Sequence, residues 1–466
     1  MPAGCIHTQT LIAHYLAQEY PSVLPSFLAA SRIPPPDLTR PPVPDLRTLV
    51  EDYISQQLVK DLSDAHIEQD VEKADDGSWR GWTPTDIVKV PLAPEVKLSG
   101  IKRSLEGISA MNLLTVGVAS VPKRVFDTTS ASYRASFEPK IVTTSVDKSL
   151  RIIDYRTGEV EEVLEPHKAA ILSFAIHPQN SRYLLTGSMD GTAQLIDLIT
   201  SKTLQSFKST KFVVRVAFSP DGHFMATASY DHNIVIYAAV TPAAPPPPDE
   251  DDMPLDETDD YLLACEPELR YEEVRRIKVD SNPEAILFHP RSTWLMYTLR
   301  SSHLLYYVDL ANEWEVKTKS FNPHPMDTHV SFSVLNMALH PSSKIIACQT
   351  GDHRGNTGER ILLYGVEPDE TERLAVLWTG CEGDDFVLPR MSWLPDGSGL
   401  ITTTPNGYLN LIALSGETRS SVKVHGAVNL GQASSEVVRD CVTVPTEDGD
   451  WEVISVGYDR QVRISR

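Results

Sequence analysis

The chain has 466 residues, of which 41% are hydrophobic and 23% charged, and its formal net charge at pH 7 is −21. This is the composition of a soluble globular protein, and no apolar run approaches the roughly 20 residues that cross a bilayer. The acidic balance argues against direct nucleic-acid binding, which needs clustered Lys and Arg, but it permits basic protein partners. The five cysteines are scattered without a CxxC pair, so no zinc site or disulfide framework is expected and the cytosol or nucleus is favoured.

Residues 1–31 are predicted to form two short amphipathic helices, because apolar residues recur at helical spacing on both sides of Pro21. The side chains that share the apolar face are Leu11, Ile12, Tyr15, Leu16, Tyr20, Val23, Leu24, Phe27 and Leu28. A unit of about 25 residues buries too little surface to be stable alone. We therefore expect this face to be covered, either by a second copy or by the rest of the chain.

The helical pair resembles the LisH motif, a short dimerisation element that precedes many propellers. The residues that carry the resemblance are Leu11, Tyr15, Leu16, Tyr20, Leu24 and Phe27. The sequence departs from the motif at Leu24, where a small residue is usual, and at Pro25 inside the second helix. The resemblance implies a homodimer or docking onto a partner's helical motif. The alternative is an amphipathic hairpin that packs on the protein's own propeller.

Residues 32–94 are expected to connect this motif to the main domain. Six prolines within residues 32–44 predict a stiff linker. Apolar residues three and four apart predict a helix over residues 45–62, which could extend the dimerising region. Trp79 and Trp82 stand in a polar stretch, and we expect them to anchor the connector on the propeller.

Three stretches with the same pattern follow one another between residues 140 and 237. Each has a β-rich run, a Ser-x-Asp turn and a second run of alternating apolar residues, which is typical of a β-hairpin. The turn residues Asp147, Asp190 and Asp231 are 43 and 41 residues apart. A period near 40 with four strands per unit is typical of a WD-type β-propeller.

The chain therefore resembles LisH-motif WD-repeat proteins over nearly all of its length. We expect an all-β fold, a seven-bladed WD40 β-propeller over residues 95–466, with a small α-helical region at the N-terminus. Seven blades follow from seven proline-containing turns that are expected to open strands. These turns are Val121-Pro122, His177-Pro178, Ser219-Pro220-Asp221-Gly222, His289-Pro290, His340-Pro341, Leu394-Pro395-Asp396-Gly397 and Val444-Pro445.

Two further features concern the ring. The last unit ends after its third strand, and residues 96–103 are predicted to supply the missing outer strand, which would close the ring. A ring of six or eight blades is the alternative, but it would require this pairing to be abandoned. Residues 241–270 interrupt the repeats, and residues 241–260 carry eight acids and no base, so we expect a disordered insertion. It is either a solvated loop or an acidic binding segment for a basic client protein.

WD repeats bury a network of a loop His, a strand Ser or Thr, a turn Asp and a Trp. His167, Ser188 and Asp190 match its first three places, with Ile196 where Trp is usual, so the resemblance implies a structural network. A catalytic triad is the alternative, but no oxyanion-hole loop or nucleophile elbow accompanies these residues. The other turn residues expected to act in the same way are Asp147, Asp231 and Asp459.

No glycine-rich phosphate loop or metal-ligand spacing is present, so no catalytic, cofactor or metal site is expected. The predicted function is a non-enzymatic scaffold or adaptor within a multiprotein complex. Asp154 and Arg156 are similar to the Asp and Arg of the Trp-Asp-x-Arg motif in propellers that recruit substrates to cullin-4 ligases, although Ile153 replaces the Trp. A ligase substrate receptor and an acidic chaperone for a ribosomal protein or histone are therefore the alternatives.

Overall fold

The computed structural model describes residues 12, 13, 15–17, 20–31, 34–36, 82–127, 132–240, 269–322, 324, 332–351, 357–381, 383, 387–426, 436–446 and 448–466. The chain divides into two compact units, Met1–Ser78 and Trp79–Arg466.

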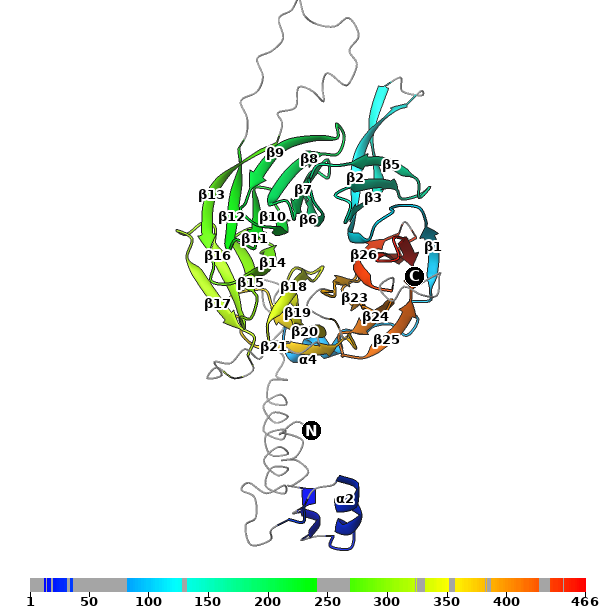
Figure 1. Cartoon of the computed structure of the whole chain (residues 1–466), viewed down its shortest axis with the longest axis vertical. Coiled ribbons are helices and arrows are strands. Elements are labelled where there is room, and N and C mark those ends of the chain that lie inside the picture. The colour runs from blue at the N-terminus through cyan, green and yellow to red at the C-terminus, as the bar shows by residue number, and fades with distance from the viewer. Residues whose placement is uncertain are drawn as a thin grey trace, which may run out of the picture. The chain divides into compact units, whose positions relative to one another are not determined.

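Seven four-stranded antiparallel sheets form the larger unit and surround a common centre (Figure 1). The prediction of an all-β, seven-bladed propeller is confirmed. We number the sheets as blades 1 to 7 in the sequence order of their innermost strands, and we count the strands of each blade outward from the centre. In each blade the first strand is innermost, and it contacts the first strands of both neighbouring blades.

The strands of the first four blades have the following bounds. Blade 1 contains β2 (Leu113–Asp127), β3 (Ser132–Ser145), β4 (Leu150–Asp154) and β5 (Val160–Leu164). Blade 2 contains β6 (Ile171–Ile176), β7 (Tyr183–Ser188), β8 (Thr192–Asp197) and β9 (Lys202–Lys208). Blade 3 contains β10 (Val213–Phe218), β11 (Phe224–Ser229), β12 (Asn233–Val240) and β13 (Arg270–Lys278). Blade 4 contains β14 (Pro283–Phe288), β15 (Trp294–Leu299), β16 (Leu304–Asp309) and β17 (Val316–Ser320).

The remaining blades complete the ring. Blade 5 contains β18 (Val334–Leu339), β19 (Ile345–Gly351), β20 (Thr357–Gly365) and β21 (Arg373–Trp378). Blade 6 contains β22 (Met391–Trp393), β23 (Gly399–Thr403), β24 (Tyr408–Ala413) and β25 (Thr418–Lys423). Blade 7 contains β26 (Val438–Pro445), β27 (Trp451–Gly457), β28 (Val462–Ser465) and β1 (Ile101–Leu105).

The second strands form the core of the ring because neighbouring blades cover both of their faces. Every residue of β7, β19 and β23 is buried, which explains why these segments read as continuous runs of small and apolar residues. The outer strands β5, β9 and β25 alternate between exposed and half-buried residues instead. The burial gradient from the centre to the rim thus follows the strand order within each blade.

The ring is closed by strands from opposite ends of the chain. Strand β1 pairs with β28, with Leu105 opposite Val462 and Ile101 opposite Ser465. The amide of Ser99 also donates to the carbonyl of Arg466. The predicted closure is confirmed, but the strand covers residues 101–105 instead of 96–103, because Leu98 turns into the core beside blade 6.

One of the seven expected turns is wrong. Val121-Pro122 lies inside the long hairpin of β2 and β3, where Pro122 is opposite Phe137 (Figure 1). The ladder continues beyond Pro122 to Asp127, because proline removes only one N–H and is tolerated at an edge position. Val444-Pro445 ends β26, and the other five proline turns join the first and second strands of their blades as expected.

The connector meets the propeller through a short helix, α4 (Pro84–Lys89), which begins with a capping box between Thr83 and Asp86. Ile87 is fully buried in the core of blades 5 and 6, and the ring of Trp82 lies 5.7 Å from that of His340. Trp82 therefore anchors the connector on the propeller, as predicted. Trp79 and the predicted helix 45–62 lie outside the described residues, as do all but residues 34–36 of the predicted linker.

The smaller unit contains the two helical segments expected from the sequence. Residues 12, 13 and 15–17 are helical, a turn follows Tyr20, and α2 (Leu24–Ser31) forms the second segment. The amide of Tyr20 donates to the carbonyl of Leu16, and the ring of Tyr20 lies 6.1 Å from that of Tyr15. Leu11 lies outside the described residues, as does the insertion from 241 to 268 between β12 and β13.

Candidate functional site

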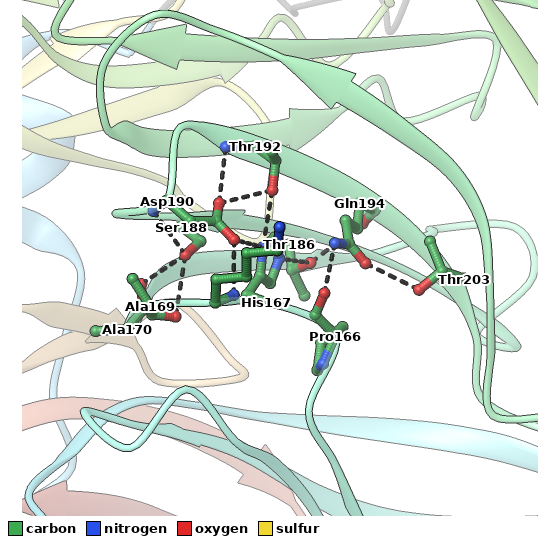
Figure 2. A network of polar contacts seen from close by, with 11 residues as sticks. Pro166, His167, Ala169, Ala170, Thr186, Ser188, Asp190, Thr192, Gln194 and Thr203 are labelled. Carbon is green, nitrogen blue, oxygen red and sulfur yellow. Dashed lines mark hydrogen bonds and ion pairs between the residues drawn. The ribbon is translucent and has the colours of Figure 1, made fainter.

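The network around His167 in blade 2 is the most complete match to the sequence analysis (Figure 2). The imidazole Nδ1 lies 3.1 Å from the carboxylate of Asp190 and 3.0 Å from the hydroxyl of Thr192. Its Nε2 lies 2.8 Å from the hydroxyl of Thr186, on the second strand of the blade. The His167 side chain is fully buried, so all of these contacts are internal.

The protonation of this network follows from its burial. Burial lowers the pKa of His167 below its ordinary value, and Asp190 offsets only part of that effect. Burial also opposes ionisation of Asp190, but hydrogen bonds from Thr192 and the Lys168 amide outweigh it and lower the Asp190 pKa. At neutral pH the network therefore joins a neutral imidazole to a carboxylate, which suits a structural clamp.

Ser188 lies close to this network but does not contact the imidazole. Its hydroxyl donates to the carbonyls of Ala169 and Ala170, at 3.1 and 3.0 Å, and accepts from the amide of Asp190. The strand hydroxyl that meets His167 is Thr186, two residues earlier. From the sequence, either Thr186 or Ser188 could be the hydroxyl of the network. Only the strand register shows that Thr186 faces the imidazole. The trio His167, Ser188 and Asp190 therefore has no nucleophile beside its base.

A second network of the same kind occupies blade 7. His425 Nδ1 lies 2.7 Å from the carboxylate of Asp459, and Nε2 lies 2.9 Å from the hydroxyl of Ser455. The sequence analysis missed His425, because it precedes its strand hydroxyl by 30 residues, whereas His167 precedes Thr186 by 19. The signal that could have identified His425 is its position before the repeat unit that contains the Gly457-Tyr458-Asp459 turn.

Asp147 and Asp231 hold their hairpin turns without a histidine. Asp147 accepts from the amide of Ser149 at 3.1 Å and from Arg151 Nη2 at 2.8 Å. Asp231 accepts from both the amide and the hydroxyl of Thr210, at 3.0 and 3.1 Å. Hydrogen bonding outweighs burial for both aspartates and keeps their pKa values below the ordinary range.

The residue after each turn aspartate has a left-handed backbone in all four hairpins. Its φ is 68° at Lys148, 80° at Gly191, 65° at His232 and 66° at Arg460. Only one of these residues is a glycine, for which such a φ carries no steric cost. The aspartate hydrogen bonds thus offset backbone strain in the other three turns.

Asp154 and Arg156, the residues similar to the ligase-adaptor motif, differ in their surroundings. Asp154 accepts from Lys140 Nζ at 2.9 Å and from the amides of Arg156 and Thr157, at 2.9 and 2.7 Å. The Thr157 amide and Lys140 lower the pKa of Asp154 to about 2. Arg156 is exposed. Asp154 therefore caps the turn after β4, while Arg156 lies at the surface.

Arg156 borders a cavity of about 660 Å³ at the seam where blade 7 meets blade 1. We call it the seam cavity, and its lining residues are Lys102, Val118, Ser120, Pro139, Tyr155, Arg156, Val444, Pro445, Thr446 and Glu452. Phe137, two residues before Pro139 on the same strand face, is 65% exposed. Phe137 is outside this lining, and the seam cavity itself combines apolar walls with an exposed arginine.

A second cavity, of about 220 Å³, lies at the centre of the ring, and we call it the central cavity. Its polar lining includes Arg215, Arg390 and Asp440, from blades 3, 6 and 7. Within the described part of the chain, no three His, Cys, Asp or Glu side chains are grouped as metal ligands. None of the helices described is both long and apolar enough to span a bilayer.

Comparison with known proteins identifies repeats in blades 1 to 3. The model of the family "WD domain, G-beta repeat" matches residues 158–197 and 201–237. The chain is 35% identical over 100 residues to Protein tipD of Dictyostelium discoideum, covering 20% of this chain and 16% of that protein.

Two other relatives match over similarly short stretches. The U3 small nucleolar RNA-associated protein 21 homolog of Schizosaccharomyces pombe is 31% identical over 85 residues, or 18% of this chain and 9% of that protein. A guanine nucleotide-binding protein subunit beta of Oryza sativa is 29% identical over 109 residues, or 22% of this chain and 29% of that protein. The chain thus spans less than a third of the length of each of these relatives.

Proposed function

We propose that this chain, a seven-bladed β-propeller that carries WD40 repeats, is a non-enzymatic scaffold that binds other proteins within a multiprotein complex. The observation that carries the proposal is the division of polar groups between the interior and the surface. The His–Asp pairs are buried in turn networks, whereas Arg156 is exposed at the edge of the seam cavity. The rice relative, whose name describes a subunit, agrees with a role in a complex.

The seam cavity is the proposed binding site on the propeller. Val118, Pro139, Val444 and Pro445 give it apolar walls, and Arg156 adds a positive charge at its edge. Binding sites of this kind combine an apolar centre with a polar rim. The matching partner segment presents apolar side chains and at least one carboxylate.

Affinity purification of the full chain followed by mass spectrometry tests this site. Arg156→Glu reverses the charge at the seam cavity and is expected to remove at least one partner. Arg275→Glu, at an exposed arginine on β13 of blade 3, is the matched control and should retain every partner. Equal partner sets from the two variants would contradict binding at the seam cavity.

A substrate receptor of a cullin-type ligase is the second candidate, favoured by the exposure of Arg156 at the end of blade 1. A cullin adaptor in the purified complex, lost with Arg156→Glu, would support it. An acidic chaperone for a basic client stays a further proposal, because residues 241–268 lie outside the described residues. A basic client that requires residues 241–260 would support that role.

The N-terminal helices are proposed to dimerise or to dock in a LisH-like manner. No residue of α2 is buried within one chain, and Tyr20 and Val23 are 54% and 49% exposed. The apolar residues of α2, Leu24, Phe27 and Leu28, are only half-buried, and a short helix gains stability when a second helix covers such a face more fully. A second copy of the chain is the occupant we propose, and the cytosol or nucleus is the proposed location of the complex.

A further inference from the structure

The central cavity has a lining to which every blade contributes. All seven innermost strands, or the residues directly beside them, reach it because the first strand of each blade faces the axis (Figure 1). Its polar members are Thr115, Ser173, Arg215, Asn336, Arg390 and Asp440. Residues far apart in the sequence therefore meet at one point only when the ring is closed.

The charges around the central cavity do not balance. Arg215 and Arg390 line it. Arg439 donates to the carbonyl of Leu388 and lies close enough to Arg390 to lower its pKa by charge repulsion. Asp440 is the only acid among the described residues of the lining, and its two oxygens already accept from the amides of Val116 and Cys441, each at 3.0 Å. The result is an excess of positive charge.

A second acid that acts on the cavity arginines already has an ion-pair partner. Glu284, on β14, accepts from Arg300 Nε at 2.6 Å, and the hydroxyl of Tyr230 lies 3.5 Å from it. Its charge still acts on Arg215 and Arg390, as does that of Asp440. Arg215, Arg300, Arg390 and Arg439 nevertheless outnumber these two acids by two charges, which favours an anion from outside the protein.

Within the described part of the chain, the guanidinium groups of Arg215 and Arg390 donate to neutral oxygens only. Arg215 Nη1 donates to the carbonyl of Val214 at 3.1 Å, and Arg390 Nη1 donates to the side-chain oxygen of Asn336 at 3.3 Å. Among the described residues, Arg215 Nη2 is buried without a hydrogen-bond partner, as is Nε of the neighbouring Arg439. A buried N–H group without an acceptor is costly, so these groups have unused capacity for an anion.

The pKa values agree with an uncompensated cationic site. Burial, together with repulsion from Arg215 and Arg439, lowers the pKa of Arg390 to about 9. Burial likewise lowers the pKa of Arg215 below its ordinary value, with Glu284 opposing the effect and Arg439 adding to it. An anion between the two guanidinium groups would raise both pKa values.

We propose that the central cavity binds a phosphate-type oxyanion between Arg215 and Arg390. Guanidinium groups bind phosphate through paired N–H···O bonds, and a dianion matches two cations where a single carboxylate would satisfy one. A cavity of about 220 Å³ holds such an ion together with several waters. The ion is either free phosphate or the phosphoryl group of a modified side chain. This site does not depend on the scaffold proposal.

Calorimetric titration and thermal unfolding of the full chain with inorganic phosphate, against chloride at equal ionic strength, test the site. Wild-type protein should show saturable binding and a higher Tm with phosphate. Arg215→Met and Arg390→Met should each weaken binding about tenfold or more. Asp440→Asn removes the cavity acid and should tighten binding roughly fivefold. Arg276→Met, which breaks only the exposed ion pair with Glu273, should leave affinity unchanged.

A structural role for the arginines predicts a different result. If they only held the blades together, Arg215→Met would lower the Tm without phosphate, whereas removal of an unpaired cation should leave that Tm equal or higher. Chloride matching phosphate, unchanged affinity in both Met variants, or no gain in Asp440→Asn would each overturn the proposal. If a Met variant does not fold, the phosphate affinity of Asp440→Asn still tests the proposal.

A second titration identifies the source of the oxyanion. A short peptide with one phosphoserine is compared with the same peptide carrying serine and with free phosphate. Tighter binding of the phosphopeptide than of free phosphate assigns the site to a modified partner. Binding of free phosphate at least as tight assigns it to the free ion. Equal binding of the two peptides, with no binding of phosphate, would overturn the site.

Discussion

His425 Nδ1 lies 2.7 Å from the carboxylate of Asp459, and the two residues come from opposite sides of the junction between blades 6 and 7. His425 follows β25 of blade 6, whereas Asp459 lies in the turn between β27 and β28. The pair therefore joins the closing blade to its neighbour, as the β1 and β28 pairing joins it to the N-terminal strand. Blade 7 is held both by backbone hydrogen bonds and by a buried side-chain network.

Asp459→Ala is expected to destabilise the propeller by about 2 to 4 kcal/mol, because it leaves the buried imidazole N–H without an acceptor. Asp309→Ala is the matched control. Asp309 accepts from the amides of Ala311 and Asn312 in a more open turn and has no histidine partner, so its loss should cost about 1 kcal/mol or less. Denaturant unfolding of both variants measures the difference. Equal costs would contradict a special role for the histidine network.

Leu105→Asp is expected to destabilise the ring by about 3 kcal/mol or more, because it places a carboxylate in the core between blades 1 and 7. Ile101→Asp lies on the same strand, but Ile101 is 42% exposed and Leu105 only 7%. The control should therefore cost about 1 kcal/mol or less. Thermal unfolding measures both. A Leu105→Asp protein with the wild-type Tm would show that β1 is dispensable for closure.

Lys319→Met is expected to stabilise the protein at pH 7 by about 1 to 3 kcal/mol. Lys319 is 1% exposed, donates to the carbonyl of Gly365 at 2.7 Å, and burial lowers its pKa to about 8. Its ordinary value is 10.5, so between about pH 8 and 10.5 the unfolded chain binds a proton that the folded protein has released. The stability of the wild type should therefore rise relative to the variant over this window.

Denaturant unfolding of wild type and Lys319→Met at pH 7 and pH 9.5 measures that difference. Lys317→Met, at an exposed lysine two residues earlier on β17, is the control and should change stability by about 0.5 kcal/mol or less at pH 7. A stability gain that does not shrink at pH 9.5 would show that the Lys319 ammonium carries no burial penalty.

The double variant Leu16→Asp and Phe27→Asp is expected to convert a dimer into a monomer while the propeller keeps its Tm. Charges on the apolar face oppose burial against a second copy, and the propeller forms a separate compact unit. Ala29→Asp, at an exposed position of α2, should leave the dimer intact. Light scattering at micromolar concentration measures the mass. A wild-type protein that is monomeric, with no partner requiring residues 1–62, would contradict the proposed dimer.

Local patterns made the propeller predictable, because strand alternation and the Ser-x-Asp turn are encoded within about 15 residues. The long hairpin of β2 and β3 could not be predicted in this way, since a proline such as Pro122 usually marks a turn. Only the pairing register shows that the ladder continues past it. The choice between Thr186 and Ser188 likewise depends on which face of the strand meets His167. Arg215 and Arg390 lie in different repeats, and no local pattern connects them before the ring closes.

The pairing of β1 with β28 also determines when the molecule can be completed during its synthesis. At about 5 to 20 residues per second, a ribosome needs tens of seconds after making β1 before it reaches Val462. Throughout that time β1 has no partner strand, and the earlier blades form an open arc with an exposed edge. Completion of the ring must therefore wait until residues 462–465 have been made, and a nascent chain interrupted before residue 462 is an aggregation-prone species for the chaperone system.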